Sequence, residues 1–96
     1  MTKQQIIEIL HNLKKEISER YKADIKGIFG SYAREEQNQN SDIDILVEFH
    51  KGATLLDLVG LSNFLEERLQ TKVDVVSQRA VRKELVDDIY KDIVYV

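Results

Sequence analysis

Two aspartates one residue apart, Asp42 and Asp44, open an apolar segment, and the pair Gly30-Ser31 stands upstream of them. Side chains at positions i and i+2 of a strand point to the same face, which places these two Cβ atoms roughly 6 to 7 Å apart. Carboxylates this close repel each other unless a cation lies between them. Because Mg²⁺ favours carboxylate and phosphate oxygens, the pair predicts a metal site that works with a phosphate ligand.

The Gly30-Ser31 pair supplies the phosphate side of this prediction. It follows a short apolar strand at 25–29 and precedes a short helix expected to begin at 32–34. Backbone N–H groups at such a turn are free to bind an anion, and glycine lets the anion approach the backbone closely. The Ser31 hydroxyl adds a donor, and Arg34, one turn further on, adds positive charge. Phosphate donors beside metal-binding acids form the layout that a nucleoside triphosphate with Mg²⁺ requires.

A third acid, Asp74, lies in the apolar segment 72–76. If this segment forms a strand beside the strand at 42–49, Asp74 joins Asp42 and Asp44 at one site. Three carboxylates can hold two metal ions, one organising the triphosphate and the other lowering the pKa of an acceptor hydroxyl.

The elements that must position these residues alternate between helix and strand. Apolar spacing predicts an amphipathic helix at 4–20, a second helix from about 55 to 68 and a third at 79–91. Thr54 and Asp57 form a capping pair ahead of the second helix, whose apolar stripe is expected to be core. The C-terminal segment 93–96 can add an edge strand. The expected fold is α/β (α+β), a small mixed sheet of three to four strands flanked by helices, in one domain spanning 1–96.

Composition narrows the function classes. The chain has 96 residues, a formal net charge of −3 and no cysteine, so a disulfide framework or a zinc–cysteine site is excluded. The acidic balance disfavours direct nucleic-acid binding. No signal peptide or membrane span is recognisable, and a cytoplasmic location is expected. The carboxylates at 87, 88 and 92 are interpreted as a solvated helix face.

The segments "GSYAREEQNQNSDIDILVEF" and "KVDVV" together resemble the nucleotidyltransferase superfamily related to DNA polymerase β. More narrowly, the chain resembles the minimal nucleotidyltransferases that act as antitoxins beside a helical toxin of the HEPN type. The likeness extends through "LLDLVGLSNFLEERLQ" to the final "DIVYV" and implies a palm-like sheet. By this resemblance Gly30 and Ser31 hold triphosphate, Asp42 and Asp44 bind both metal ions, and Asp74 faces the acceptor.

The resemblance implies transfer of AMP from ATP, with Mg²⁺, to a hydroxyl of a HEPN-type toxin, with tyrosine as the expected acceptor. A domain of this size leaves little room for an acceptor-binding module, so the acceptor is expected on another protein. Two alternatives stay open: an antitoxin that neutralises its partner by binding alone, and nucleotidyl transfer to a small molecule. The base specificity, the number of nucleotides transferred and a homo-oligomeric state are left undetermined. One departure stands out, because Glu35 occupies a position at which the subgroup commonly has glycine.

Overall fold

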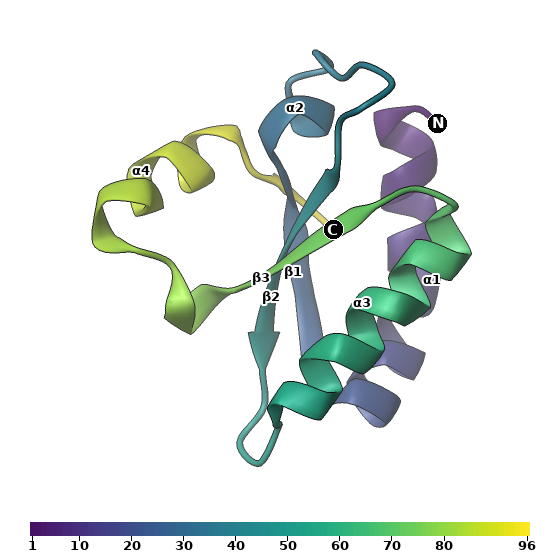
Figure 1. Ribbon diagram of the computed structural model, residues 1–96, viewed down its shortest axis with the longest axis vertical. Helices are drawn as coiled ribbons and strands as arrows, with labels where there is room; N and C mark the ends of the chain where they lie inside the picture. The colour runs from purple at the N-terminus through teal and green to yellow at the C-terminus, as the bar shows by residue number, and fades with distance from the viewer.

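The computed structural model describes residues 1–96, which form helices and strands in alternation (Figure 1). Helix α1 precedes strand β1, a one-turn helix α2 and strand β2. Helix α3 and strand β3 follow, and then a 3-10 turn η1, helix α4 and strand β4. The bounds are Lys3–Tyr21 for α1, Ala23–Phe29 for β1, Gly30–Ala33 for α2, Ile43–Phe49 for β2, Leu55–Leu69 for α3, Val73–Ser77 for β3, Gln78–Ala80 for η1, Lys83–Asp92 for α4 and Val94–Tyr95 for β4.

The four strands form one mixed sheet in the order β3-β2-β1-β4. Strand β1 runs antiparallel to β2 and to β4, whereas β2 and β3 are parallel. The prediction of three to four strands is confirmed, including the C-terminal edge strand. The predicted helix at 79–91 was wrong at its start, because 78–80 form a 3-10 turn and the α-helix begins at Lys83.

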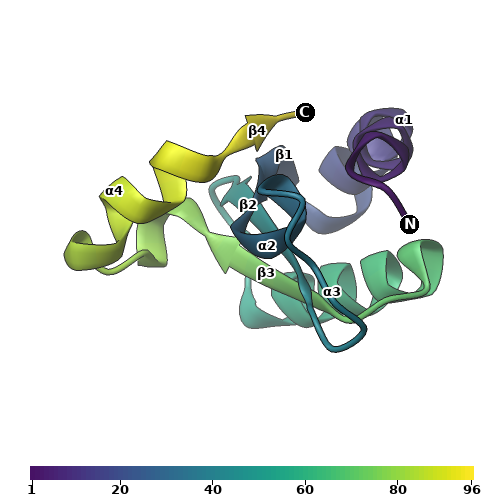
Figure 2. The same ribbon diagram turned by 90° about the horizontal axis from the view of Figure 1, so that it is seen from above.

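The sheet separates two layers of helices. Helices α1 and α3 cover one face and α4 lies on the other (Figure 2). Strand β2 supplies Ile43, Ile45 and Val47 to the core beneath α1 and α3, and all three are fully buried. Leu46 points to the opposite face and is also fully buried. Strand β2 is therefore rigidly held on both faces, which fixes the carboxylates at its start.

The first turns of α3 depart from the expectation that this helix is core along its length. Leu55 and Leu56 are 72% and 83% exposed, and Val59 is half exposed. In the second half of the helix the apolar residues are buried, namely Leu61, Phe64, Leu65 and Leu69. The Asp57 carboxylate accepts the Thr54 backbone N–H at 2.9 Å, so the predicted capping pair is confirmed. No helix of this fold is both long enough and apolar enough to cross a membrane.

Strand β4 reaches the sheet because β1 has a glycine at the contact. The β1–β2 register shifts between Ile25 and Gly27, and Gly27 pairs with Tyr95 of β4. A Cβ at Gly27 would lie 2.5 Å from the Val94 carbonyl oxygen, so only glycine permits this approach. The sequence predicted a close backbone approach at Gly27. The pairing with β4 fixes the position of the segment that follows α4.

Candidate active site

The sheet topology brings the predicted site residues to one end of the sheet. Because β1 and β2 are antiparallel, the last residue of β1, Phe29, pairs with Asp44. Strands β2 and β3 are parallel, and their register pairs Asp44 with Asp74. Gly30 therefore begins α2 directly beside the two facing aspartates. The expectation that Asp74 lies on the strand next to Asp44 is confirmed.

Asp44 is the electrostatic centre of this cluster. Burial raises the pKa of its carboxyl from 3.8 to about 6, and the neighbouring charges of Asp74 and Asp42 contribute to this rise. The Arg34 guanidinium acts in the opposite direction. These effects require all three acids and the arginine to lie near one another. A carboxylate under such repulsion is stabilised by any cation that binds between the acids.

The raised pKa of Asp44 makes the metal-free protein less stable at neutral pH. The folded state binds the proton more tightly than the unfolded chain, so the stabilisation is present below about pH 4 and is lost as the pH rises through 6. Asp44→Asn is expected to raise the free energy of unfolding at pH 7 by about 1 kcal/mol after allowance for solvent screening. Urea denaturation in EDTA should show this gain at pH 7 and a smaller one at pH 4.5. A gain that grows at low pH would contradict the prediction, and Asp88→Asn, an exposed carboxylate on α4, is the control.

Gly30 has a backbone conformation and a neighbour that both favour glycine. Its φ is +72°, and a Cβ there would overlap the Asp44 carboxylate. The turn that follows is closed by backbone hydrogen bonds, with Arg34 N–H donating to the Gly30 carbonyl at 3.1 Å and Glu36 N–H to the Ser31 carbonyl at 2.8 Å. The Gly30-Ser31 turn and the Asp44 carboxylate are thus in direct contact, as the sequence order alone did not reveal.

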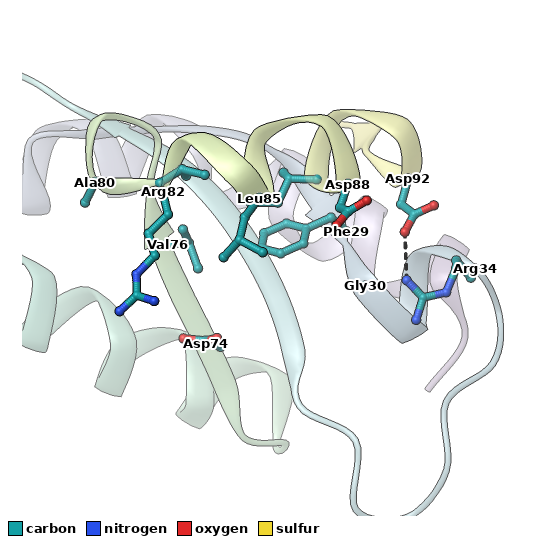
Figure 3. A pocket seen from close by; sticks show the side chains of 12 residues that line it. Phe29, Gly30, Arg34, Asp74, Val76, Ala80, Arg82, Leu85, Asp88 and Asp92 are labelled. Atoms are coloured by element: carbon teal, nitrogen blue, oxygen red, sulfur yellow. Dashed lines mark hydrogen bonds and ion pairs between the residues drawn. The ribbon is translucent and has the colours of Figure 1, made fainter.

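A cavity of about 430 Å³ lies between α4 and the sheet, and Gly30 and Asp74 form part of its wall (Figure 3). Half of its lining residues are apolar, including Phe29 of β1, Val76 of β3 and Leu85 of α4. Asp88 and Asp92 also line it. Asp88 is exposed, as the solvated-face interpretation expected, whereas Asp92 is partly buried and pairs with Arg34. Sequence reasoning missed this wall because α4 buries only Ile89 and its pattern is typical of a surface helix.

Arg34 and Asp42 border the site in different ways. Arg34 is exposed and lines the cavity, and its side chain is paired with Asp92 and Glu36. Asp42 lies one residue before β2 and lines a separate polar cavity, also of about 430 Å³, together with Asn40 and Lys72. Tyr32, whose role the sequence left open, is buried in the core beside this second cavity.

The donor set suits a hard divalent cation, although no three acidic or histidine side chains converge into a ready-made metal cluster. Asp42 lines a different cavity from Asp74. Mg²⁺ is commonly held by one or two carboxylates with substrate phosphate and water completing its shell. Asp44 and its partner Asp74 fit that description, with Asp42 close enough to raise the pKa of Asp44.

Glu35 occupies a backbone conformation that glycine prefers. Its φ is +59°, and its carboxylate pairs with Lys3 of α1 at 3.3 Å. The turn after Arg34 is therefore kept without glycine, and the added negative charge is compensated by the α1 lysine. A non-glycine residue in the left-handed region carries a cost of roughly 1 to 2 kcal/mol.

We expect Glu35→Gly to stabilise the protein by roughly 0.5 kcal/mol. Glycine relieves the left-handed strain but makes the unfolded chain more flexible, so the two effects partly cancel. Urea denaturation with an unchanged m-value measures this gain. Gln70→Gly, at a second non-glycine residue with φ of +53°, is the matched control and should change stability in the same direction. A loss of stability in Glu35→Gly alone would show that the Lys3 pair outweighs the strain.

Comparison with known proteins shows which family this chain belongs to. The model of the nucleotidyltransferase domain family matches residues 10–96. A Methanocaldococcus jannaschii protein provisionally named protein adenylyltransferase MJ0126 is 42% identical over 96 residues, covering 99% of this chain and 98% of the relative. Protein adenylyltransferase MntA of Thermococcus cleftensis is 36% identical, covering 100% and 97%.

Solved structures extend the agreement to the fold. A protein solved under the provisional description of minimal nucleotidyltransferase has a TM-score of 0.82 and 31% identity, covering 100% of this chain and 97% of its own. A toxin–antitoxin structure with AMP-PNP has a TM-score of 0.70 and 25% identity, covering 99% and 72%. The match to the family model over most of the chain and the shared fold identify a nucleotidyltransferase. The chain belongs to the nucleotidyltransferase domain family, among its minimal members.

Proposed function

We propose that this chain is a Mg²⁺-dependent protein adenylyltransferase that acts in the cytoplasm as an antitoxin. It transfers AMP from ATP to a tyrosine hydroxyl of a HEPN-type toxin. The observation that carries the proposal is the contact between Gly30 and Asp44, with Asp74 as the register partner of Asp44. It joins a turn suited to phosphate to a pair of carboxylates suited to Mg²⁺. The names of the relatives support protein as the acceptor.

The nucleotide is held at the junction of β1, α2 and β2. The backbone N–H groups of Gly30 and Ser31 and the Ser31 hydroxyl bind the triphosphate, and Arg34 contributes charge. The cavity beneath α4 has an apolar wall and a volume suited to the nucleoside. The triphosphate is thereby placed with its α-phosphorus near Asp44 and its remaining phosphates over the turn.

The carboxylates provide the charge that the reaction needs. Asp44 would hold Mg²⁺ together with Asp42 and with its register partner Asp74, and Asp74 would lie on the acceptor side. When bound, Mg²⁺ supplies charge neutralisation at the triphosphate and acidifies the acceptor hydroxyl. The acceptor hydroxyl loses its proton to solvent, and its oxygen forms a bond to the α-phosphorus. The bond from that phosphorus to the bridging oxygen breaks, and pyrophosphate leaves. Catalysis here is mainly positioning and electrostatic stabilisation, as is general for phosphoryl chemistry.

Intact-mass spectrometry of the partner tests this proposal. The chain is incubated with Mg²⁺, ATP and a candidate HEPN-type partner protein, and tandem spectrometry then locates any added AMP. ATP with a methylene bridge between the α- and β-phosphates is the matched control, because it binds but cannot release pyrophosphate. With Mg²⁺ and ATP, we expect the partner to gain mass in AMP units, located on a tyrosine. We expect no added mass with the methylene analogue or with EDTA. A partner that stays unmodified but is still neutralised would instead establish the binding antitoxin.

A further inference from the structure

The Arg34 guanidinium is held between two carboxylates. Its Nη1 donates to Asp92 Oδ2 at 2.7 Å, and its Nε donates to Glu36 Oε2 at 3.2 Å. Both hydrogen bonds raise the pKa of Arg34, and the bond with Asp92 has the larger effect. Glu36 belongs to the same turn as Arg34, whereas Asp92 is 58 residues away along the chain. The Asp92 contact is therefore the one that joins two separate parts of the fold.

Asp92 is the last residue of α4, and its contact with Arg34 is a tether for that helix (Figure 3). Only Ile89 of α4 is buried, so apolar packing holds the helix weakly. The pair with Arg34 is the one ion pair that α4 makes, and no other hydrogen bond joins an α4 side chain to the rest of the protein. Helix α4 forms one wall of the cavity that contains Gly30 and Asp74. The tether thus lies in the wall of the cavity, beside the Gly30 turn.

Carboxylates outnumber arginines around this cavity, so an anionic ligand depends on the positive charge of Arg34. The lining includes three carboxylates, Asp74, Asp88 and Asp92, and two arginines, Arg34 and Arg82. The charge of Arg34 also acts on Asp44, which places the guanidinium near the metal-binding acids. A triphosphate that approaches Gly30 therefore meets an arginine already engaged by two carboxylates. Charge-assisted hydrogen bonds to phosphate compete directly with those to carboxylate.

We infer that Asp92 is a positioning residue that holds Arg34 on α4 in the nucleotide-free protein and competes with the triphosphate for it. This inference rests on the proposed function, because it takes Gly30 and Arg34 as the triphosphate site. Nucleotide binding moves Arg34 from Asp92 to phosphate and releases the one polar tether of α4. By linkage, a stronger tether weakens nucleotide binding, and bound nucleotide loosens α4. Helix α4 then reports the occupancy of the site to a partner that contacts it.

Calorimetric titration tests the competition directly. The probe is Mg²⁺ with α,β-methylene-ATP, added to the full chain without acceptor. Asp88→Asn is the matched control, because Asp88 lies one turn earlier on α4, lines the same cavity and makes no ion pair. Both substitutions remove one negative charge, but only Asp92→Asn also frees Arg34. We expect Asp92→Asn to tighten binding about two- to fivefold beyond Asp88→Asn, the range of an exposed ion pair.

Two further variants separate competition from a structural role of Asp92. In an Arg34→Ala background, the difference between Asp92→Asn and Asp88→Asn should vanish, because no guanidinium is left to release. Asp92→Glu keeps the tether and should bind the probe like the wild type. Amide hydrogen exchange in α4 should rise when the probe binds to the wild-type chain, and it should already be high in Asp92→Asn. Unchanged exchange in α4 on binding would overturn the release of the helix.

The outcomes distinguish this inference from the proposed function. Equal affinities of Asp92→Asn and Asp88→Asn, or weaker binding by Asp92→Asn, with normal binding by the wild type, would overturn the competition alone. Failure of the wild-type chain to bind the probe would overturn both. A persistent difference in the Arg34→Ala background would show that Asp92 acts through its own charge, which also contradicts the inference.

Discussion

Asp44→Asn is expected to reduce the rate of AMP transfer by about a thousandfold or more. The amide keeps the shape of the side chain but loses the charge that a divalent cation needs, at the most central of the three acids. Loss of metal-based charge stabilisation is worth several kcal/mol in a transition state, and each 1.4 kcal/mol is tenfold in rate. The measurement is the initial rate of AMP incorporation into the purified partner with saturating ATP and Mg²⁺.

Two comparisons make this result specific to the metal site. Glu48→Gln changes another carboxylate of β2, at the far end of the strand, where it pairs with Lys26 at 3.3 Å. This control should retain activity within about twofold, because a surface substitution away from the site has little effect. Asp44→Asn should still bind the partner, since it is also expected to be the more stable protein without metal. Transfer by Asp44→Asn at the wild-type rate would remove Asp44 from the catalytic set.

The opposite effects expected for Asp44 on stability and on activity have one physical origin. Repulsion among Asp44, Asp74 and Asp42 destabilises the metal-free fold and attracts a cation. Asp44→Asn relieves this repulsion, so it removes both the destabilisation of the metal-free fold and the attraction for a cation. A site that stores such repulsion is typical of a protein in which function limits stability. Mg²⁺ with nucleotide should therefore stabilise the wild-type chain more than the Asp44→Asn variant.

The sequence predicted the sheet end of the site because its determinants are local. The alternation around Asp44 and the Gly30-Ser31 turn both lie within a segment of about 20 residues. Asp74 joins them once two apolar strands pair in parallel. The role of α4 could not be predicted in this way. Asp92 and Arg34 are 58 residues apart, and the amphipathic pattern of α4 is the same whether its polar face meets solvent or a cavity.

Two further features depended on tertiary structure. The exposure of Leu55 and Leu56 was not readable from the spacing of α3, because an apolar residue near a helix start packs only if a neighbouring element covers it. Glu35 shows the reverse case, since the turn forced a left-handed conformation on a residue that disfavours it. Local preference predicts the element, and the surrounding contacts decide which of its faces is buried.

Gly30→Ala is expected to reduce transfer by about a hundredfold, the second-largest effect. The new methyl group would occupy the position of the Asp44 carboxylate, so either the turn or the acid must move. A displacement of about 1 Å in a positioned catalytic group commonly costs a factor of this size. The variant should also lose roughly 1 to 2 kcal/mol of stability, because its φ of +72° disfavours alanine.

Gly52→Ala separates the two causes, because Gly52 also has a left-handed backbone conformation. Its φ is +92°, but no atom lies within 4 Å of the position that a Cβ would take, so its alanine variant carries the backbone strain without the collision. Both variants should lose stability, but only Gly30→Ala should lose AMP transfer and weaken binding of the Mg²⁺–nucleotide. If the two variants transferred AMP equally well, the contact between Gly30 and Asp44 would not govern catalysis. Selective loss in Gly30→Ala would establish that the phosphate-binding turn and the metal-binding carboxylate work as one unit, since a single methyl group between them disables both.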